Sequence, residues 1–193
     1  MNDQILRIAT IFILIGWRAY WEIKAQTAQK AKPAEKKKKT FFYLFQRHAL
    51  TFPIAIVVFQ LIGLPIFIAP VSDIGLYIGF SMVLVGAFIS IHARRILADN
   101  WTHAFDYQVK IKHELIISGI YKYIRHPIYT GMIVCFVGAE IVARSYLFIP
   151  LFIIMFLWAY FQGKSEERIL RSHFGVQYEK YMTKSKMLIP FLL

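Results

Sequence analysis

The residue types that can do chemistry are concentrated in a short polar segment, Gly119 to Gly131. Within it, Arg125 and His126 directly precede Pro127, a residue that favours the first turn of a helix. A helix N-terminus flanked by Arg and His offers donors to an anionic group, and tyrosines can lie against a cation or a purine. The same residues also suit a membrane boundary, where Arg snorkels and tyrosines form an aromatic belt. The tyrosines are Tyr121, Tyr123 and Tyr129.

A second candidate is the acidic pair Glu166 and Glu167, about 35 residues further along the chain. In the first turn of a helix, two acids complement the helix dipole, and Glu167 is spaced to pair with Arg171. We therefore expect Glu167 to face solvent. Alternatively, a carboxylate near Arg125 and His126 can hold the ammonium group of a ligand. Charge and spacing leave both interpretations open.

The elements that must position these residues are predicted to be membrane-spanning helices. The chain has 193 residues and is 58% hydrophobic, which is more apolar than a water-soluble domain. Its apolar residues form runs close to the length of about 20 residues that a helix needs to cross a bilayer. The sequence thus predicts an all-α integral membrane protein with about five transmembrane helices. The predicted spans are residues 5–21, 50–69, 74–92, 128–142 and 146–162.

The distribution of charge predicts the orientation of these spans. Twenty of the 23 Lys and Arg residues lie in the three segments 24–47, 94–125 and 164–186, which five spans place on one side. Positively charged loops are usually cytoplasmic, so we expect the N-terminus outside and the C-terminus inside the cell. The four lysines Lys36 to Lys39 are expected to lie against anionic headgroups. This pattern argues against nucleic acid as the partner, despite the net charge of +12.

Two regions are predicted, residues 1–99 with the first spans and a basic loop, and residues 100–193 with the chemistry. We expect residues 93–125 to form an ordered cap and residues after the fifth span to form a separate interfacial helix, interrupted at Gly175. A cytoplasmic pocket is expected between the segment before span four and that helix. The single cysteine, Cys135, lies inside a span and is expected to pack there, and no metal site is predicted.

The spacing of these motifs resembles that of the isoprenylcysteine carboxyl methyltransferase family. The resemblance rests on the run from Arg125 to Gly131, on the run from Glu166 to Leu170, and on the run from Phe174 to Tyr181. It covers nearly half of the chain, from about residue 100 to residue 190. Phospholipid N-methyltransferases and membrane sterol reductases share parts of the pattern.

The resemblance implies an S-adenosylmethionine cofactor at the cytosolic face. By position in the motif, Glu166 would meet the charged methionine end of the cofactor. Arg125 and Gln162 are the candidate catalytic residues, and Gln162 stands where the family usually has an arginine that holds an acceptor carboxylate. Asp106 stands where a relative has glutamine. The remaining expected cofactor residues are His113, Glu114, Leu115, Ile116, Tyr121, His126, Pro127, Ile128 and Tyr129.

The sequence therefore predicts a methyltransferase acting on a lipid-like or prenylcysteine-type acceptor that enters from the bilayer. Gln162 keeps two alternatives open, because it lacks the charge of arginine. One is a phospholipid amine N-methyltransferase, whose acceptor needs no carboxylate clamp. The other is a non-catalytic membrane scaffold of the same fold.

Overall fold

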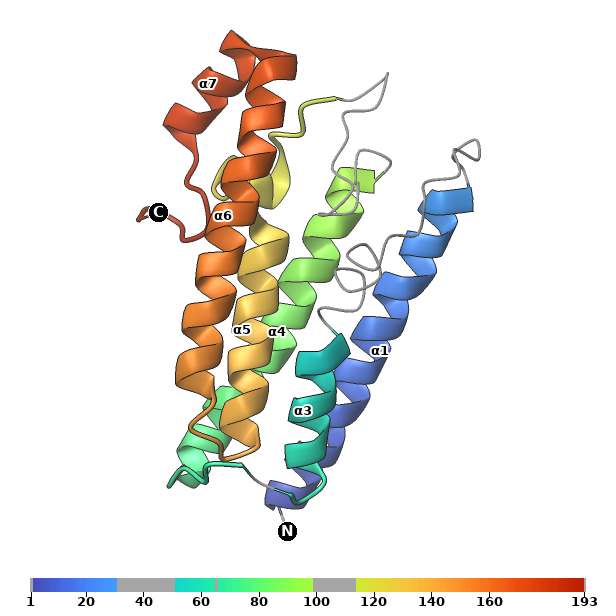
Figure 1. Cartoon of the computed structure of the whole chain (residues 1–193), viewed down its shortest axis with the longest axis vertical. Helices are drawn as coiled ribbons and strands as arrows, with labels where there is room; N and C mark the ends of the chain where they lie inside the picture. The colour runs from blue at the N-terminus through green and yellow to red at the C-terminus, as the bar shows by residue number, and fades with distance from the viewer. Residues whose placement is uncertain (1, 31–50, 65, 99–113, 193) are drawn as a thin grey trace.

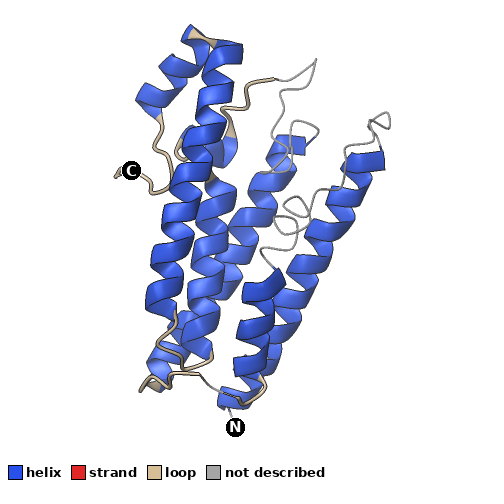
Figure 2. Ribbon diagram, in the orientation of Figure 1, coloured by secondary structure: helices blue, strands red, loops and turns tan. Residues whose placement is uncertain are grey.

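The described part of the chain is an elongated helical bundle (Figure 1). The computed structural model describes residues 2–30, 51–64, 66–98 and 114–192. Within these ranges, β-type backbone pairing is limited to two isolated bridges, so the prediction of an all-α fold is confirmed (Figure 2). The helices are α1 (Asn2–Lys30), α3 (Thr51–Leu61), α4 (Asp73–Leu97), the 3-10 turn η3 (Gly119–Lys122), α5 (Pro127–Val142), α6 (Phe148–Phe174) and α7 (Val176–Lys184).

In the described chain, α4 and α6 are the helices long and apolar enough to cross a membrane, and α5 is apolar but has 16 residues. The count of five spans is therefore not confirmed. The predicted second span, residues 50–69, was wrong in extent, because α3 ends at Leu61. The chain turns there at Gly63, whose φ of 105° suits glycine. With 11 residues, α3 is about 16 Å long, well short of a bilayer.

Helices α4 and α5 form the tightest contact of the bundle, because glycines let their backbones meet. A Cβ atom built on Gly131 of α5 would lie 2.7 Å from the carbonyl oxygen of Gly86 in α4. One heptad further along, a Cβ on Gly138 would lie 2.5 Å from the carbonyl oxygen of Gly79. Neither site has room for a larger residue. Close backbone approach at small residues is how helices associate in membranes, where lipid removes the hydrophobic driving force.

Helices α5 and α6 form the tight hairpin that the sequence predicts. Helix α5 ends at Val142 and α6 begins at Phe148, with Arg144 in the left-handed region at φ 57°. The Ser145 hydroxyl accepts a hydrogen bond from the backbone N–H of Leu147. Pro150 lies in the first turn of α6, where its missing N–H costs nothing. The hairpin therefore returns the chain to the end at which α5 began.

The prediction of a separate interfacial helix after the fifth span was wrong. Helix α6 runs without a break through Gly163 to Phe174, so Glu166 and Glu167 lie in its last turns rather than in a first turn. Gly175, with φ 52°, ends α6 and begins the short α7, which confirms the predicted interruption (Figure 1). After α7 the chain turns back along the bundle towards the start of α5. Its backbone pairs there with residues 123–126.

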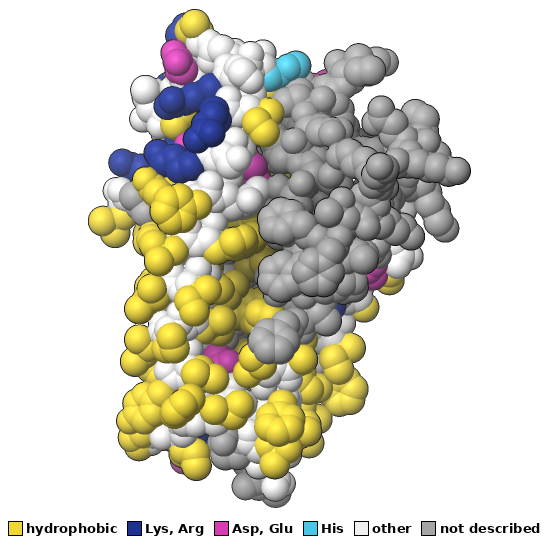
Figure 3. Space-filling view, in the orientation of Figure 1, with side chains coloured by type: hydrophobic (Ala, Val, Ile, Leu, Met, Phe, Trp, Pro, Cys, Tyr) yellow, Lys and Arg dark blue, Asp and Glu magenta, His cyan; other side chains and the backbone are white. Residues whose placement is uncertain are grey.

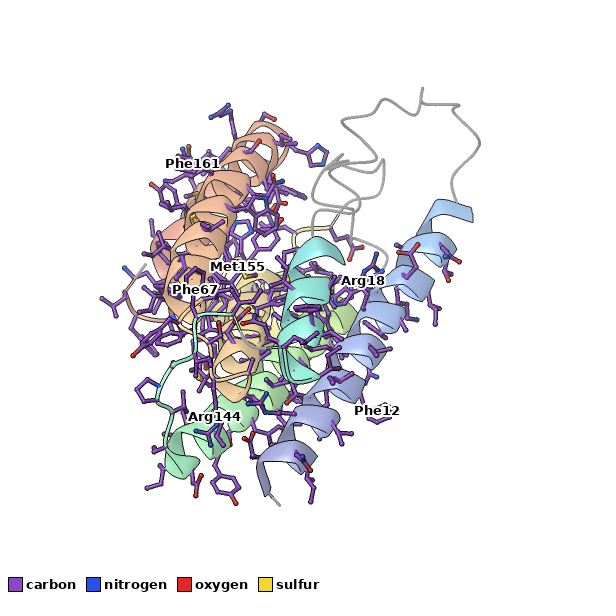
Figure 4. The ribbon with its side chains drawn as sticks, turned by 60° about the horizontal axis from the view of Figure 1, so that its bottom comes forward. Phe12, Arg18, Phe67, Arg144, Met155 and Phe161 are labelled. Carbon is purple, nitrogen blue, oxygen red and sulfur yellow. The ribbon has the colours of Figure 1, made fainter. Side chains whose placement is uncertain are left out.

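A polar network, which we call the distal cluster, connects α1, α3 and the hairpin at the end of the bundle where the chain begins. It consists of Asp3, Arg7, Gln60, Glu140 and Arg144. The buried amide of Gln60 donates to both carboxylate oxygens of Glu140, at 3.1 and 3.0 Å. Asp3 accepts from Arg7 at 2.8 Å and from Arg144 at 3.3 Å. These contacts tie the first helix to the α5–α6 turn (Figure 4 labels Arg144).

Candidate functional site

The candidate site lies at the opposite end of the bundle, where α6 passes over the start of α5. His126 caps α5, and Pro127 occupies the first helical position, as the sequence predicts. Gly163 makes the crossing possible, since a Cβ there would lie 3.1 Å from the imidazole carbon Cδ2 of His126. Both acidic residues of α6 follow directly and turn inward. Glu166 is 7% exposed and Glu167 is 2% exposed.

His126 lies between the two carboxylates. Its Nδ1 is 3.3 Å from Oε2 of Glu166, and its Nε2 is 3.5 Å from Oε1 of Glu167. Burial alone would lower the pKa of His126, but the nearby carboxylates of Glu166 and Glu167 outweigh it and hold that pKa above its ordinary value. The imidazole is therefore poised to carry a positive charge. We call Arg125, His126, Tyr129, Glu166 and Glu167 the site cluster.

Glu166 is the acceptor on which most of these side chains converge. The Tyr129 hydroxyl donates to its Oε1, and the Gln162 amide donates to the same oxygen at 3.3 Å. His126 faces the second oxygen. Since a carboxylate has about four lone-pair sites, these three partners leave room for one further donor. Glu166 can thus hold an ammonium group without losing its own supports.

Glu167 has a different role from the one predicted. We expected it to face Arg171 and solvent, and that was wrong: it is buried and accepts a 2.6 Å hydrogen bond from Nε of Arg125. The same guanidinium donates to the backbone oxygen of Ser185 and reaches that of Met182 at 3.5 Å. Arg125 is therefore engaged within the protein. Its predicted catalytic role stays a prediction.

Aromatic rings form one wall of the site. The rings of His126 and Tyr129 are stacked, with centroids 5.6 Å apart and planes at 10°. Trp158 of α6 meets Tyr129 edge to face, with centroids 5.2 Å apart. Such surfaces can bind a planar base or a cation. Trp158 was missed by the sequence analysis, although it lies two turns before Glu166 on the same helix.

The segment after α7 was also missed, and it braces the site. The backbone N–H groups of Arg125 and His126 donate to the carbonyl oxygens of Lys186 and Met187, at 2.8 and 3.0 Å. The Thr130 hydroxyl donates to the Leu188 carbonyl at 2.6 Å. These bonds join residues about 60 positions apart. Backbone pairing of this kind leaves no mark in the residue types, so no sequence pattern announced it.

The other predicted site residues differ in their burial and in their contacts. Tyr121 is buried; its hydroxyl donates to Ala93 O at 3.3 Å, and its carbonyl accepts from the Tyr181 hydroxyl at 2.6 Å. Glu114 is exposed, whereas Leu115, Ile116 and Ile128 are partly buried and Pro127 is buried. His113 and Asp106 lie outside the described residues, as do the lysines Lys36 to Lys39. Within the described ranges, there is no group of three metal-binding side chains, and Cys135 is buried.

Comparisons with known proteins match this region. A family model described as phospholipid methyltransferase matches residues 74–177, more than half of the chain. A probable protein-S-isoprenylcysteine O-methyltransferase of Oryza sativa subsp. indica is 32% identical over 118 residues, covering 60% of this chain and 61% of that protein. The protein-S-isoprenylcysteine O-methyltransferase of Saccharomyces cerevisiae is 30% identical over 121 residues, covering 60% of this chain and 48% of that protein.

A solved structure shares the fold. It is described as a eukaryotic intramembrane Ras methyltransferase, an isoprenylcysteine carboxyl methyltransferase, and its TM-score to this chain is 0.64 at 18% identity. The similarity covers 97% of this chain and 68% of that one. The chain spans about half to three fifths of the length of the Oryza sativa and Saccharomyces cerevisiae relatives. Together these matches confirm the resemblance to isoprenylcysteine carboxyl methyltransferases that the motifs predicted.

Proposed function

This chain belongs to the phospholipid methyltransferase family, and we propose on that premise that it is an integral-membrane methyltransferase using S-adenosylmethionine. The acceptor is a lipid-like or prenylcysteine-type molecule that enters laterally from the bilayer. The observation that carries the proposal is the buried convergence of Tyr129, Gln162 and His126 on Glu166. Tyr129, His126 and Glu166 come from two of the motifs on which the resemblance rests, and Gln162 lies one helical turn before Glu166.

The residues present fit such a cofactor. Glu166 keeps a lone pair for the amino group of its methionine end, and Arg125 already neutralises the neighbouring Glu167. The stacked rings of His126 and Tyr129 offer a face for a purine. The positions Glu114, Leu115 and Ile116 lie on the approach to η3, and with His113 they complete the proposed set.

When bound, this cofactor supplies an electrophilic methyl group on its sulfonium. The protein's own share of the work is to orient the two reactants and to keep water away. Glu166 would orient the methionine end of the cofactor, since three donors hold its carboxylate in place. The buried His126, Tyr129 and Glu167 close the end of the bundle, and the aromatic wall excludes solvent.

Gln162 bears on the acceptor class. Its amide donates to Glu166, so the residue stands beside the proposed cofactor site, one turn closer to the middle of α6. Without a guanidinium it binds a carboxylate weakly, which favours the second candidate, a phospholipid amine N-methyltransferase. The proposed orientation keeps this end of the bundle and the C-terminus cytoplasmic and the N-terminus outside.

The test is transfer of a labelled methyl group into total membrane lipids and into prenylated-cysteine peptides, with products resolved by mass. We expect labelling of one class by wild type and loss of labelling in Glu166→Gln. The matched control is Glu179→Gln, which removes an exposed acid from α7 and should leave transfer unchanged. Absence of saturable S-adenosylhomocysteine binding by the purified chain would support the scaffold alternative instead.

The variant Gln162→Arg separates the two acceptor classes. If a carboxylate is the acceptor, a charge-assisted hydrogen bond worth roughly 1.5–3 kcal/mol should raise kcat/KM on prenylcysteine peptides. If an amine is the acceptor, the added cation repels it, and native activity should fall. The measurement is the ratio of the two activities in wild type and variant. An unchanged ratio would show that residue 162 does not contact the acceptor.

A further inference from the structure

A basic surface covers the outer side of the site end of the bundle. Lys164, Arg168 and Arg171 are exposed on α6. Their spacing of four and three residues places them on one face of the helix, turned away from Glu166. Figure 3 shows Lys and Arg side chains gathered over the upper part of α6 and over α7. The face of α6 opposite Glu166 is therefore strongly positive.

The same surface continues on α7 and the segment that follows it. Lys180 and Lys184 are exposed on α7, and Lys186 is exposed just after it. Glu179 is the one exposed acid in residues 163–192, all of which the structure describes. We define the basic surface as the six side chains Lys164, Arg168, Arg171, Lys180, Lys184 and Lys186.

Exposed apolar side chains border the basic surface. Phe161 on α6 is 67% exposed, and Phe191 and Leu192 after α7 are 85% and 78% exposed. Figure 3 shows hydrophobic side chains directly below the basic ones, and Figure 4 shows Phe161 on the outer side of α6. Positive charge above an apolar band matches the boundary between headgroups and acyl chains.

We propose that the basic surface binds the phosphate headgroups of anionic phospholipids, with Phe161, Phe191 and Leu192 in the acyl region beneath them. Anionic lipid complements the charge, and each basic residue near such a membrane contributes to binding. An acidic soluble protein would neutralise the charge but leave the apolar band unmatched. The proposal is independent of the methyl acceptor, since this face of α6 is turned away from Glu166.

Lipid bound here also supports the candidate site. Lys186 belongs to the basic surface, and its carbonyl accepts from the backbone N–H of Arg125 at 2.8 Å. The next residue, Met187, accepts from His126. Headgroups that hold the segment in place therefore hold the polypeptide that braces Arg125 and His126. Anionic lipid should raise the thermal stability of the protein, not only accumulate around it.

The experiment uses the full chain in nanodiscs of phosphatidylcholine with and without phosphatidylglycerol. Phosphatidylglycerol should be enriched around wild type and should raise its Tm. In the variant Arg168→Gln/Lys180→Gln the preference should fall about twenty-fivefold, because each basic residue near an anionic surface contributes roughly fivefold. The matched control, Lys24→Gln/Arg95→Gln, removes two exposed charges outside the basic surface and should lower the preference by much less.

A second variant, Arg168→Lys/Lys180→Arg, preserves charge and should behave as wild type, which separates charge from folding. Three results would overturn the proposal. One is no preference for phosphatidylglycerol in wild type. Another is an equal loss in the control variant, which would mean that total charge alone attracts the lipid. The third is full displacement of the lipid by inorganic phosphate, which would identify a site for soluble anions.

Discussion

The two ends of the bundle bury carboxylates in different ways. In the site cluster, Arg125 pairs with Glu167, and His126 lies between Glu166 and Glu167; both basic residues come from the segment that begins α5. In the distal cluster, the buried Glu140 receives the neutral amide of Gln60. The guanidinium groups of the distal cluster bind other acceptors. Arg7 and Arg144 donate to Asp3, and Arg144 also donates to the Val71 carbonyl.

The difference separates the proposed binding arrangement from a structural one. In the distal cluster, charged groups bond to each other and to loop carbonyls, and so they join α1 to the hairpin. In the site cluster, Arg125 neutralises Glu167, which leaves Glu166 with its donors and one lone pair. A ligand with a positive charge can be held there at little cost. The following predictions test this contrast.

The largest effect is expected from Arg125→Met. Removing the guanidinium breaks the buried Arg125–Glu167 pair and leaves only His126, 3.5 Å away, beside Glu167; breaking a buried ion pair costs about 3–5 kcal/mol. The matched change in the distal cluster is Arg144→Met, whose side chain is 28% exposed and should cost about 1 kcal/mol or less. Denaturation in detergent followed by circular dichroism measures both. Equal losses would remove the distinction between the two ends.

Ligand binding should depend on the site cluster and not on the distal cluster. Glu166→Gln removes a charged acceptor and should weaken S-adenosylhomocysteine binding by about 1.5–3 kcal/mol, measured by calorimetry. The same substitution at Glu140 keeps the shape but lies at the far end, so it should leave the affinity unchanged. If Glu140→Gln weakened binding as much, the ligand would not be held at Glu166.

The site cluster should also make stability depend on pH. The pKa of His126 is raised in the folded protein, so its contribution to stability is complete below the unfolded pKa and is lost as pH rises through the folded pKa. Above about pH 6.5, stability should fall with a slope of at most about 1.4 kcal/mol per pH unit. His126→Gln should flatten that slope. A slope that persists in this variant would have to come from another group.

The smallest effect is expected from Glu140→Gln on stability. Gln60 can still form a hydrogen bond to the new amide, so the change should cost under about 1 kcal/mol. Glu140→Leu leaves the Gln60 amide buried and unpaired, and should cost about 1–3 kcal/mol. Comparing the two variants by denaturation isolates the hydrogen bond. A large loss in Glu140→Gln would indicate that the distal cluster relies on the charge of Glu140.

The sequence predicted the meeting of the two motifs, and for a physical reason. A hairpin between α5 and α6 has to return Glu166 to the end where His126 begins α5, whatever the packing details. The helical bounds were less predictable. Leu50 to Ala69 is mostly apolar, yet the helix ends at Leu61 and the chain turns at Gly63, a residue type that favours a helix end.

The error at Glu167 has a specific cause. Its spacing from Arg171 satisfies the rule for helix pairs, and local rules cannot see Arg125, which is 42 positions away. Adjacent acids point about 100° apart, so both are buried only where a helix is covered on two sides. Here His126 and the segment after α7 provide that cover. Glu140, an acid inside an apolar run, was a visible signal for the distal cluster.

The glycine contact between α4 and α5 sets the order in which the protein opens. Because the two backbones meet at Gly86 and Gly131 and again at Gly79 and Gly138, these helices can separate only as one cooperative unit. Helix α1 has no comparable interlock, since it carries exposed side chains along most of its length. Amide hydrogens at the centre of α5 should therefore exchange with deuterium last, and those of α1 should exchange while the site cluster is still intact.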